Sequence, residues 1–213
     1  MPTTTKTRKL YTYDQLGPKG KQAAIEWYRD DNDIDCSDRL VDIFDIEIAD
    51  YYGLTNCKVM FSLGNCQGDG VAIKGNPNLY RWAEAEADKD KVEPDDTLRK
   101  LLDQIAGLCL LAGEDEPLLS CTITHHSRYC HSNSMDVTVE SGEWYKDKPE
   151  FGEVISQLEV DVQDWCSQRV KEISQELTET GYAEIDYQNS DEAIAGMLQC
   201  NDYRFTRRGE FVK

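Results

Sequence analysis

All three histidines of the chain lie in one short segment, His125-His-Ser-Arg-Tyr-Cys-His131, which also holds a thiol at Cys130. Imidazole and thiolate are zinc ligands, and a cysteine beside a histidine can form a nucleophilic pair. Successive strand residues point to opposite faces, so His125 and His126 cannot readily bind one ion together. No signature adds an oxyanion site or an orienting third group. We therefore expect a polar hairpin tip here, and we predict no catalytic residue, metal ligand or cofactor.

The segment Gln67-Gly-Asp-Gly70 offers a second candidate site, because Asp69 can bind a cation and the amides of a glycine turn can bind an anion. Glycine is also required wherever a hairpin tip needs positive φ angles, and this explanation is the simpler one. A small metal-dependent or Cys/His enzyme centred on both tips stays an alternative. The candidate residues at the two tips are Gln67, Asp69, Arg128, Tyr129 and His131.

Carboxylates recur at steps of three and four residues along two segments, which places them on one face of a helix. Each four-residue step advances about 6 Å, comparable to the spacing of phosphates along a nucleic-acid strand. Few basic residues compensate them, so each face can imitate a phosphate backbone; an ordinary solvated face is the alternative. The candidate partner-binding residues are Asp38, Asp42, Asp45, Glu47 and Asp50 in the first segment and Glu153, Asp161, Asp164, Glu172 and Glu176 in the second.

The overall charge points the same way, since the 213 residues carry a formal net charge of -18. Such an excess of carboxylates repels nucleic acid and anionic membranes, which bind proteins through lysine and arginine. It attracts basic surfaces, including those with which other proteins hold nucleic acid. The expected partner is therefore a protein with a basic nucleic-acid-binding surface, with no direct binding to nucleic acid or membrane. Acidity that only maintains solubility is the alternative.

The elements that must position these residues follow from hydrophobic periodicity and turn residues. Helices are predicted at 18–31, 37–53, 97–112, 151–180 and 190–200, with glycines 53, 113 and 181 as stops, and strands at 10–13, 57–62, 71–74, 120–126, 135–140 and 203–206. The charged segment 84–96, which contains Pro94, is predicted to be a loop. No βαβ series appears, so we expect an α+β fold. It is an antiparallel sheet built from hairpins, packed against several amphipathic helices, in a single domain over residues 1–213.

Eight cysteines are scattered without a CxxC pair, as is typical of reduced cytosolic thiols. The first ten residues lack the apolar run of a signal peptide, and no stretch approaches the length of a membrane span. The expected location is the cytoplasm. The chain contains no GxxxxGKS/T, HExxH or GxSxG motif, which lowers the expectation of an enzyme. The sequence predicts no particular oligomeric state.

The whole chain resembles a family of small acidic proteins of tailed bacteriophages, mostly called hypothetical and sometimes labelled antitoxin-like. Five collinear segments carry this resemblance: Tyr13-Asp-Gln-Leu-Gly-Pro-Lys-Gly-Lys-Gln-Ala-Ala24, Glu26-Trp-Tyr-Arg29, Phe61-Ser-Leu-Gly-Asn-Cys-Gln-Gly-Asp-Gly70, the hairpin from His126 to Asp136, and the ending with Ser190-Asp-Glu-Ala-Ile194 and Asn201-Asp-Tyr-Arg-Phe-Thr206. The central segment of the family more often ends in Ser-Gln-Gly-Asp-Gly, so Cys66 stands where a serine is usual. The resemblance implies a phage origin, the host cytoplasm and the fold, but no settled activity.

Together these observations predict a non-catalytic, phage-encoded inhibitor of a host nucleic-acid-binding protein. Its acidic helix faces would act as a DNA mimic, in anti-defence such as anti-CRISPR or anti-restriction action, or in takeover of transcription. An antitoxin-like protein that neutralises a basic toxin is an alternative that differs only in its target. The metal-dependent or Cys/His enzyme at the hairpin tips is the alternative of a different class.

Overall fold

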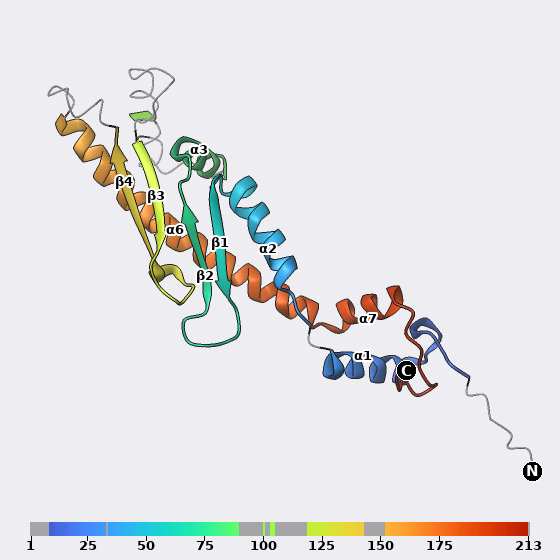
Figure 1. Ribbon diagram of the computed structural model, residues 1–213. Coiled ribbons are helices and arrows are strands. Elements are labelled where there is room, and N and C mark those ends of the chain that lie inside the picture. The colour runs from blue at the N-terminus through green and yellow to red at the C-terminus, as the bar shows by residue number, and fades with distance from the viewer. Residues whose placement is uncertain are drawn as a thin grey trace, which may run out of the picture. The chain divides into compact units, whose positions relative to one another are not determined.

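The computed structural model describes residues 9–32, 34–89, 100, 103–104, 119–142 and 152–212 (Figure 1). Almost all of the helix predicted at 97–112 lies outside these residues. The contacts divide the chain into two compact units. The larger unit is Arg39–Gly181, and the smaller combines Met1–Asp38 with Tyr182–Lys213. Each unit is described by itself, and the single domain expected from the sequence stays a prediction.

Two hairpins form the sheet of the larger unit. Strand β1 (Cys57–Ser62) pairs with β2 (Gly70–Gly75), and β3 (Leu119–His125) pairs with β4 (Met135–Ser141). The strand order is β1-β2-β3-β4 and every pairing is antiparallel. Alternate residues of β3 and β4 are buried, as expected for strands with one face toward a core. The predicted hairpins and the α+β fold class are therefore confirmed.

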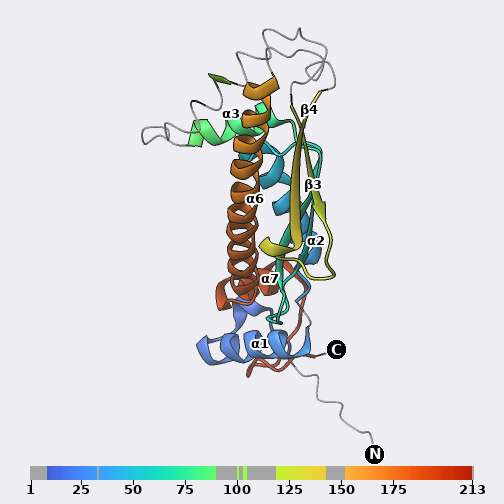
Figure 2. The same cartoon turned by 90° about the vertical axis from the view of Figure 1, so that its left-hand side faces the viewer.

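Helix α6 (Gly152–Gln188) lies along one face of this sheet (Figure 2). Its buried residues recur at helical spacing on the side toward the strands: Ile155, Leu158, Val162, Cys166, Val170, Ile173, Ser174, Leu177 and Gly181. Nine acidic and two basic residues occupy much of the remaining surface of the helix. Among the residues that the structure describes, no helix is both long and apolar enough to cross a membrane.

Helix α6 also satisfies backbone groups of the sheet. Strands β2 and β3 are joined in register at Gly75 and Ile123. Elsewhere in β2, the N–H of Val71 donates to Oγ1 of Thr178 at 3.1 Å, and its carbonyl accepts from Oγ of Ser174 at 2.5 Å. Buried backbone groups require such partners, so two hydroxyls of α6 fix the beginning of β2 to the helix.

The prediction that Gly181 ends the long helix was wrong, because α6 continues to Gln188. A Cβ atom at this position would lie 2.5 Å from Cδ1 of Leu63 and 2.9 Å from Cζ of Phe44. Glycine is therefore required by close packing inside the helix. The local preference of glycine for helix ends does not apply here.

Two further helices lie in the larger unit, except for Ser37 and Asp38, which the contacts assign to the smaller one. Helix α2 (Ser37–Ile46) continues into a π-helical turn at Glu47–Tyr51, close to the predicted limits of 37–53. Helix α3 (Leu79–Lys89) corrects the prediction of a loop at 84–96 over its first residues. Trp82 and Glu86 are one helical turn apart and both are buried, so tertiary packing holds this charged segment as a helix.

The smaller unit is built on helices α1 (Pro18–Asp31) and α7 (Asp191–Cys200), both close to their predicted positions. Oγ of Ser190 accepts a hydrogen bond from the N–H of Ala193 at 3.2 Å and so caps α7. The buried core of the unit consists of Tyr13, Leu16, Ala24, Ile25, Ile194, Leu198 and Phe205.

The strands predicted at 10–13 and 203–206 are reduced to isolated bridges. Phe205 pairs with Tyr11 on one side and with Phe211 on the other. Both bridges are antiparallel. The final residues of the described chain are therefore joined to Tyr11 and to one another through single backbone pairings rather than through a sheet.

Candidate functional site

The structure brings the two hairpin tips together. A Cβ atom at Gly68 would lie 2.5 Å from Cδ1 of the Tyr129 ring, and one at Gly70 would lie 2.7 Å from the carbonyl oxygen of Cys130. Both glycines have positive φ angles, 92° and 149°. The backbone of both glycines therefore lies so close to the second tip that a side chain at either position would clash with it.

Asp69 organises its own loop. Its carboxylate accepts hydrogen bonds from Oγ of Ser62 at 2.7 Å, from the N–H of Gly64 at 2.7 Å and from the N–H of Cys66 at 2.6 Å. A short acidic side chain is suited to such turns because it reaches nearby backbone amides. The geometry of the first tip thus accounts for Asp69 and for the glycines on either side of it.

The three histidines do not converge, since each contacts a different part of the second hairpin. Nε2 of His125 lies 2.9 Å from the carbonyl oxygen of Tyr129, and Nδ1 of His126 lies 3.0 Å from Oδ2 of Asp136. Nδ1 of His131 accepts from the N–H of Asn133 at 3.1 Å. Within the described part of the chain, no three His, Cys, Asp or Glu residues are grouped so that they could hold a metal ion.

The thiol between these histidines is held in its protonated form. Burial, and then the negative charge of Asp69, raise the pKa of Cys130 above its ordinary value. Thiolate is the reactive form of cysteine, so this environment opposes nucleophilic chemistry at Cys130.

Three predicted tip residues, Gln67, Arg128 and Tyr129, are exposed at the junction of the hairpins. The guanidinium of Arg128 lies 4.7 Å from the centroid of the Tyr129 ring, and its Nη2 donates to the hydroxyl of Tyr129 at 2.5 Å. His131 is half-buried and stacks beside the same ring at 6.4 Å. Arginine and tyrosine often dominate the binding energy of protein interfaces, so this pair is a candidate contact.

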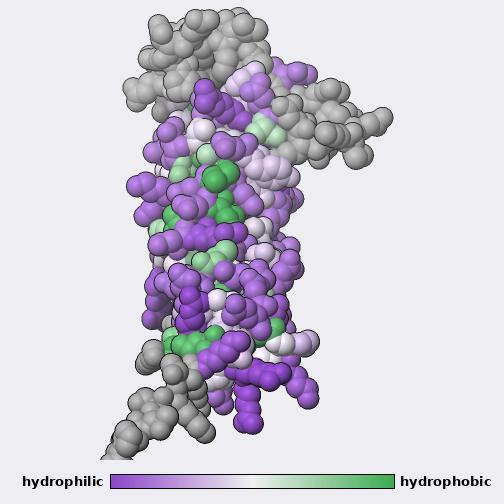
Figure 3. Space-filling view, turned by 90° about the vertical axis from the view of Figure 1, so that its right-hand side faces the viewer, coloured by the Kyte–Doolittle hydropathy of each residue, from purple (hydrophilic) through white to green (hydrophobic). Residues whose placement is uncertain are grey.

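The acidic residues of α2 and its π-helical turn mostly face solvent. Four of the five predicted residues are exposed, and Glu47 is half-buried; the exposed residues are Asp38, Asp42, Asp45 and Asp50. The opposite side of the helix is buried through Leu40 and Phe44, and the Phe44 ring packs edge-to-face on Phe61 at 5.3 Å. Figure 3 shows that hydrophilic residues cover most of the coloured surface on this side of the molecule.

The predicted acidic residues of α6 divide into two sets. Glu153, Asp161 and Asp164 are exposed, and Oδ1 of Asp161 accepts from Nε2 of Gln157 at 2.8 Å. Glu172 and Glu176 are only partly exposed and form ion pairs within the larger unit. The five residues therefore do not form one uninterrupted face.

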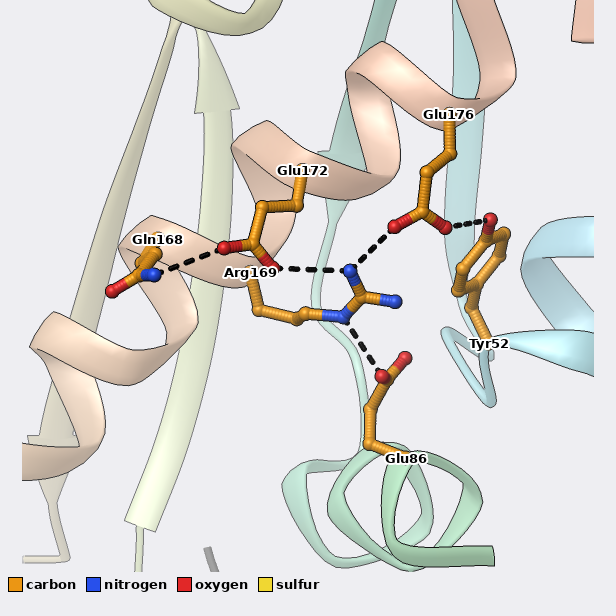
Figure 4. A network of polar contacts seen from close by, with 6 residues as sticks. All are labelled: Tyr52, Glu86, Gln168, Arg169, Glu172 and Glu176. Atoms are coloured by element: carbon orange, nitrogen blue, oxygen red, sulfur yellow. Dashed lines mark hydrogen bonds and ion pairs between the residues drawn. The ribbon is translucent and has the colours of Figure 1, made fainter. Parts of the chain in front are cut away.

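Glu172 and Glu176 belong to a polar network around Arg169, drawn in Figure 4. Nε of Arg169 lies 2.7 Å from Oε2 of Glu86, and its Nη1 lies 2.7 Å from Oε1 of Glu176 and 3.1 Å from Oε2 of Glu172. The other oxygen of Glu176 accepts from the hydroxyl of Tyr52 at 2.5 Å. One arginine thus connects α3, α6 and the residue that follows the π-helical turn.

Burial and hydrogen bonding fix the protonation states in this network. Burial alone lowers the pKa of Arg169, but hydrogen bonds to Glu176 and Glu86 outweigh it, so the pKa is raised. Burial, and then the hydrogen bond to Glu176, raise the pKa of Tyr52. Arg169 stays charged and Tyr52 stays neutral, as suits a structural ion-pair network.

The sequence patterns assigned no role to Tyr52, Glu86 or Arg169. Glu86 fell in the segment predicted to be a loop, and Tyr52 fell within the helix predicted at 37–53. One available signal was that Arg169 and Lys171 are the only basic residues between 152 and 188, among nine acidic ones. Arg169 lies three residues before Glu172, which is a spacing of ion pairs on a helix, and seven residues, about two turns, before Glu176.

A family model with the description "Domain of unknown function (DUF8835)" matches residues 27–191. No curated protein and no solved structure matches the chain. The matched range includes the two hairpin tips, the acidic residues of α2 and α6 and the Arg169 network. The candidate residues therefore all lie within the part of the chain that the family has in common.

Proposed function

The chain belongs to the family of the domain of unknown function DUF8835, and we propose that it is a non-catalytic protein that binds the basic, nucleic-acid-binding surface of a partner protein. The observation that carries this proposal is the row of exposed carboxylates on α2, at Asp38, Asp42 and Asp45. Steps of four and three residues keep these groups on one side of a rigid helix. Such a row presents negative charge as the phosphates of a nucleic-acid strand do.

The distribution of charge in the chain supports this assignment. Residues 39–181 contain 28 acidic and 13 basic residues, a net charge of −15. The other unit contains 13 acidic and 10 basic residues, a net charge of −3. Acidity required only for solubility needs no such concentration, whereas electrostatic attraction to a basic groove benefits from it.

The resemblance to small acidic phage proteins suggests what the partner is. In this proposal the protein acts in the host cytoplasm as an inhibitor, and the partner is a host protein of defence or transcription whose nucleic-acid site it occupies. A basic toxin is the alternative target, and it would be bound by the same carboxylates. Both targets share one chemistry, a concave or grooved surface rich in lysine and arginine.

The proposal is tested by capture from a nuclease-treated host lysate with tagged protein, at low and at high salt. We expect a nucleic-acid-binding protein to be retained at low salt, released at high salt, and displaced by duplex DNA. The variant Asp42→Lys/Asp45→Lys/Asp161→Lys should lose this capture. Capture that resists high salt, or that DNA does not displace, would contradict the proposal.

A matched control separates a specific acidic face from net charge. Asp14→Lys/Glu192→Lys/Asp202→Lys changes three exposed carboxylates of the smaller unit and shifts the net charge by the same amount. We expect this variant to capture the partner nearly as well as the unmodified protein. If both triple variants lose capture equally, the rows on α2 and α6 have no special role.

A further inference from the structure

A surface pocket of about 520 Å³ lies in the smaller unit. One side comes from a single face of α1, where Ala23, Trp27 and Asp31 are four residues apart. The other side comes from Gly209, Glu210 and Phe211 near the end of the described chain. This volume is in the range of pockets that hold small ligands or a large side chain.

The apolar wall of the pocket is tightly built. The rings of Trp27 and Phe211 stack with centroids 4.2 Å apart and planes inclined by 14°. Gly209 has a φ angle of 90°, and a Cβ atom there would lie 2.1 Å from the carbonyl oxygen of Gly20 and 2.9 Å from Cβ of Ala23. The glycine turn therefore rests directly on α1 and fixes the position of the wall.

Two carboxylates flank this wall. Oδ2 of Asp31 accepts from Nε1 of Trp27 at 2.5 Å, and Oε2 of Glu210 accepts from Oγ1 of Thr206 at 3.3 Å. Each carboxylate thus has one oxygen held in place and a second one available to a ligand. Among the residues that the structure describes, no lysine or arginine lines the pocket; Arg207 and Arg208 precede Gly209 in sequence but are not among its lining residues.

We propose that this pocket binds an arginine side chain of a partner protein. The methylene groups of arginine would lie on the Trp27 and Phe211 side, and its guanidinium would reach the carboxylates of Asp31 and Glu210. A phosphate or carboxylate ligand would be repelled by both acidic groups. A neutral apolar ligand would desolvate the two carboxylates without compensating their negative charge.

The pocket is independent of the rows proposed for the basic partner surface. Asp31 and Glu210 belong to the smaller unit, whereas Asp42, Asp45, Asp161 and Asp164 belong to the larger one. The pocket also selects by shape, since an aromatic wall and two carboxylates fit one planar cationic group. The ligand is thus a single arginine side chain. A short arginine peptide can therefore replace the whole partner protein in a binding experiment.

The test is a titration of the isotopically labelled full chain with the peptide acetyl-Gly-Arg-Gly-amide, followed by NMR. We expect saturable shifts of the Trp27 indole N–H and of the amides of Gly209 to Phe211, and no shifts with acetyl-Gly-Gly-Gly-amide. Asp31→Asn/Glu210→Gln should weaken the interaction about tenfold, as expected for loss of charged contacts. The amide side chains keep an acceptor for Trp27 and Thr206, so the fold should be preserved.

The control is Asp14→Asn/Glu192→Gln, which removes two exposed carboxylates of the same unit outside the pocket. This variant should bind the arginine peptide as the unmodified chain does. Equal affinity in the Asp31/Glu210 variant would overturn the proposal. So would shifts spread evenly over acidic residues of both units, and a lysine peptide that binds as well would remove the preference for guanidinium.

Discussion

The hydroxyl of Tyr52 donates a hydrogen bond of 2.5 Å to Oε2 of Glu176, a residue 124 positions later in the chain. The other oxygen of Glu176 lies 2.7 Å from Nη1 of Arg169. This contact links the end of the α2 segment to the middle of α6 through one carboxylate. Helix α6, which carries nine acidic residues, therefore uses one of them to bind a neighbouring element of the larger unit.

Removal of the arginine should destabilise the larger unit. Arg169→Leu removes the guanidinium that pairs with Glu86, Glu172 and Glu176, and the side chain of Glu86 is only 8% exposed. We expect the free energy of unfolding to fall by about 2–4 kcal/mol in urea denaturation, since removing one partner of a buried ion pair is costly. The control is Lys171→Leu, an exposed basic residue of the same helix, which should change stability by about 0.5 kcal/mol or less. Similar losses in the two variants would contradict a structural role for the network.

The stability of the protein should depend on Tyr52 at alkaline pH. Its pKa is raised in the folded state, so above about pH 10 the folded chain keeps a proton that the unfolded chain releases. Stability contributed by Tyr52 is therefore present at neutral pH and lost as the pH rises. Denaturation curves should show a steeper alkaline loss for the unmodified chain than for Tyr52→Phe. Tyr80→Phe, at an exposed tyrosine, should keep the steep loss of stability. If Tyr52→Phe lost stability with pH as steeply as the unmodified chain, Tyr52 would not be the source of this dependence.

Contact between the hairpin tips should depend on glycine at position 70. Gly70→Ala would place a Cβ atom 2.7 Å from a backbone oxygen at a φ angle of 149°, so we expect a loss of about 2 kcal/mol or more. Gly64→Ala is the matched control in the same loop, because its nearest neighbour would be a side-chain oxygen at 3.7 Å. That variant should differ by less than about 1 kcal/mol. Thermal unfolding of both variants measures the difference, and equal melting temperatures would refute the close packing of the tips.

Two glycines within helices should respond in opposite directions to alanine. Gly196→Ala in α7 meets open space, so the better helix propensity of alanine should stabilise the protein by about 0.5–1 kcal/mol. Gly181→Ala in α6 would contact Leu63 and Phe44 and should destabilise it by about 1–3 kcal/mol. Chemical denaturation of each variant separates the two effects. A gain in stability at position 181 would contradict the close packing of Leu63 and Phe44 against this glycine.

Local pattern was sufficient for most of the secondary structure. Alternating residues located both hairpins, and apolar spacing located α1, α2, α7 and most of α6, because these periodicities depend only on neighbours in the chain. The strands predicted at 10–13 and 203–206 are only isolated bridges. The errors at Gly181 and in α3 arose where distant residues decide the outcome. Phe44 and Leu63 require a glycine within α6, and burial of Trp82 and Glu86 holds a charged segment in a helix.

The sequence by itself determined the excess of negative charge, the helical spacing of the carboxylates and the composition of each hairpin tip. Only the tertiary structure decided which of these carboxylates face solvent, as Asp42 and Asp45 do, and which are held by Arg169, as Glu172 and Glu176 are. It also decided that Gly68 rests against Tyr129 and that Trp27 stacks on Phe211. The physical reason is that spacing along a chain fixes the direction of a side chain within its element, whereas its partners depend on how elements far apart in sequence pack.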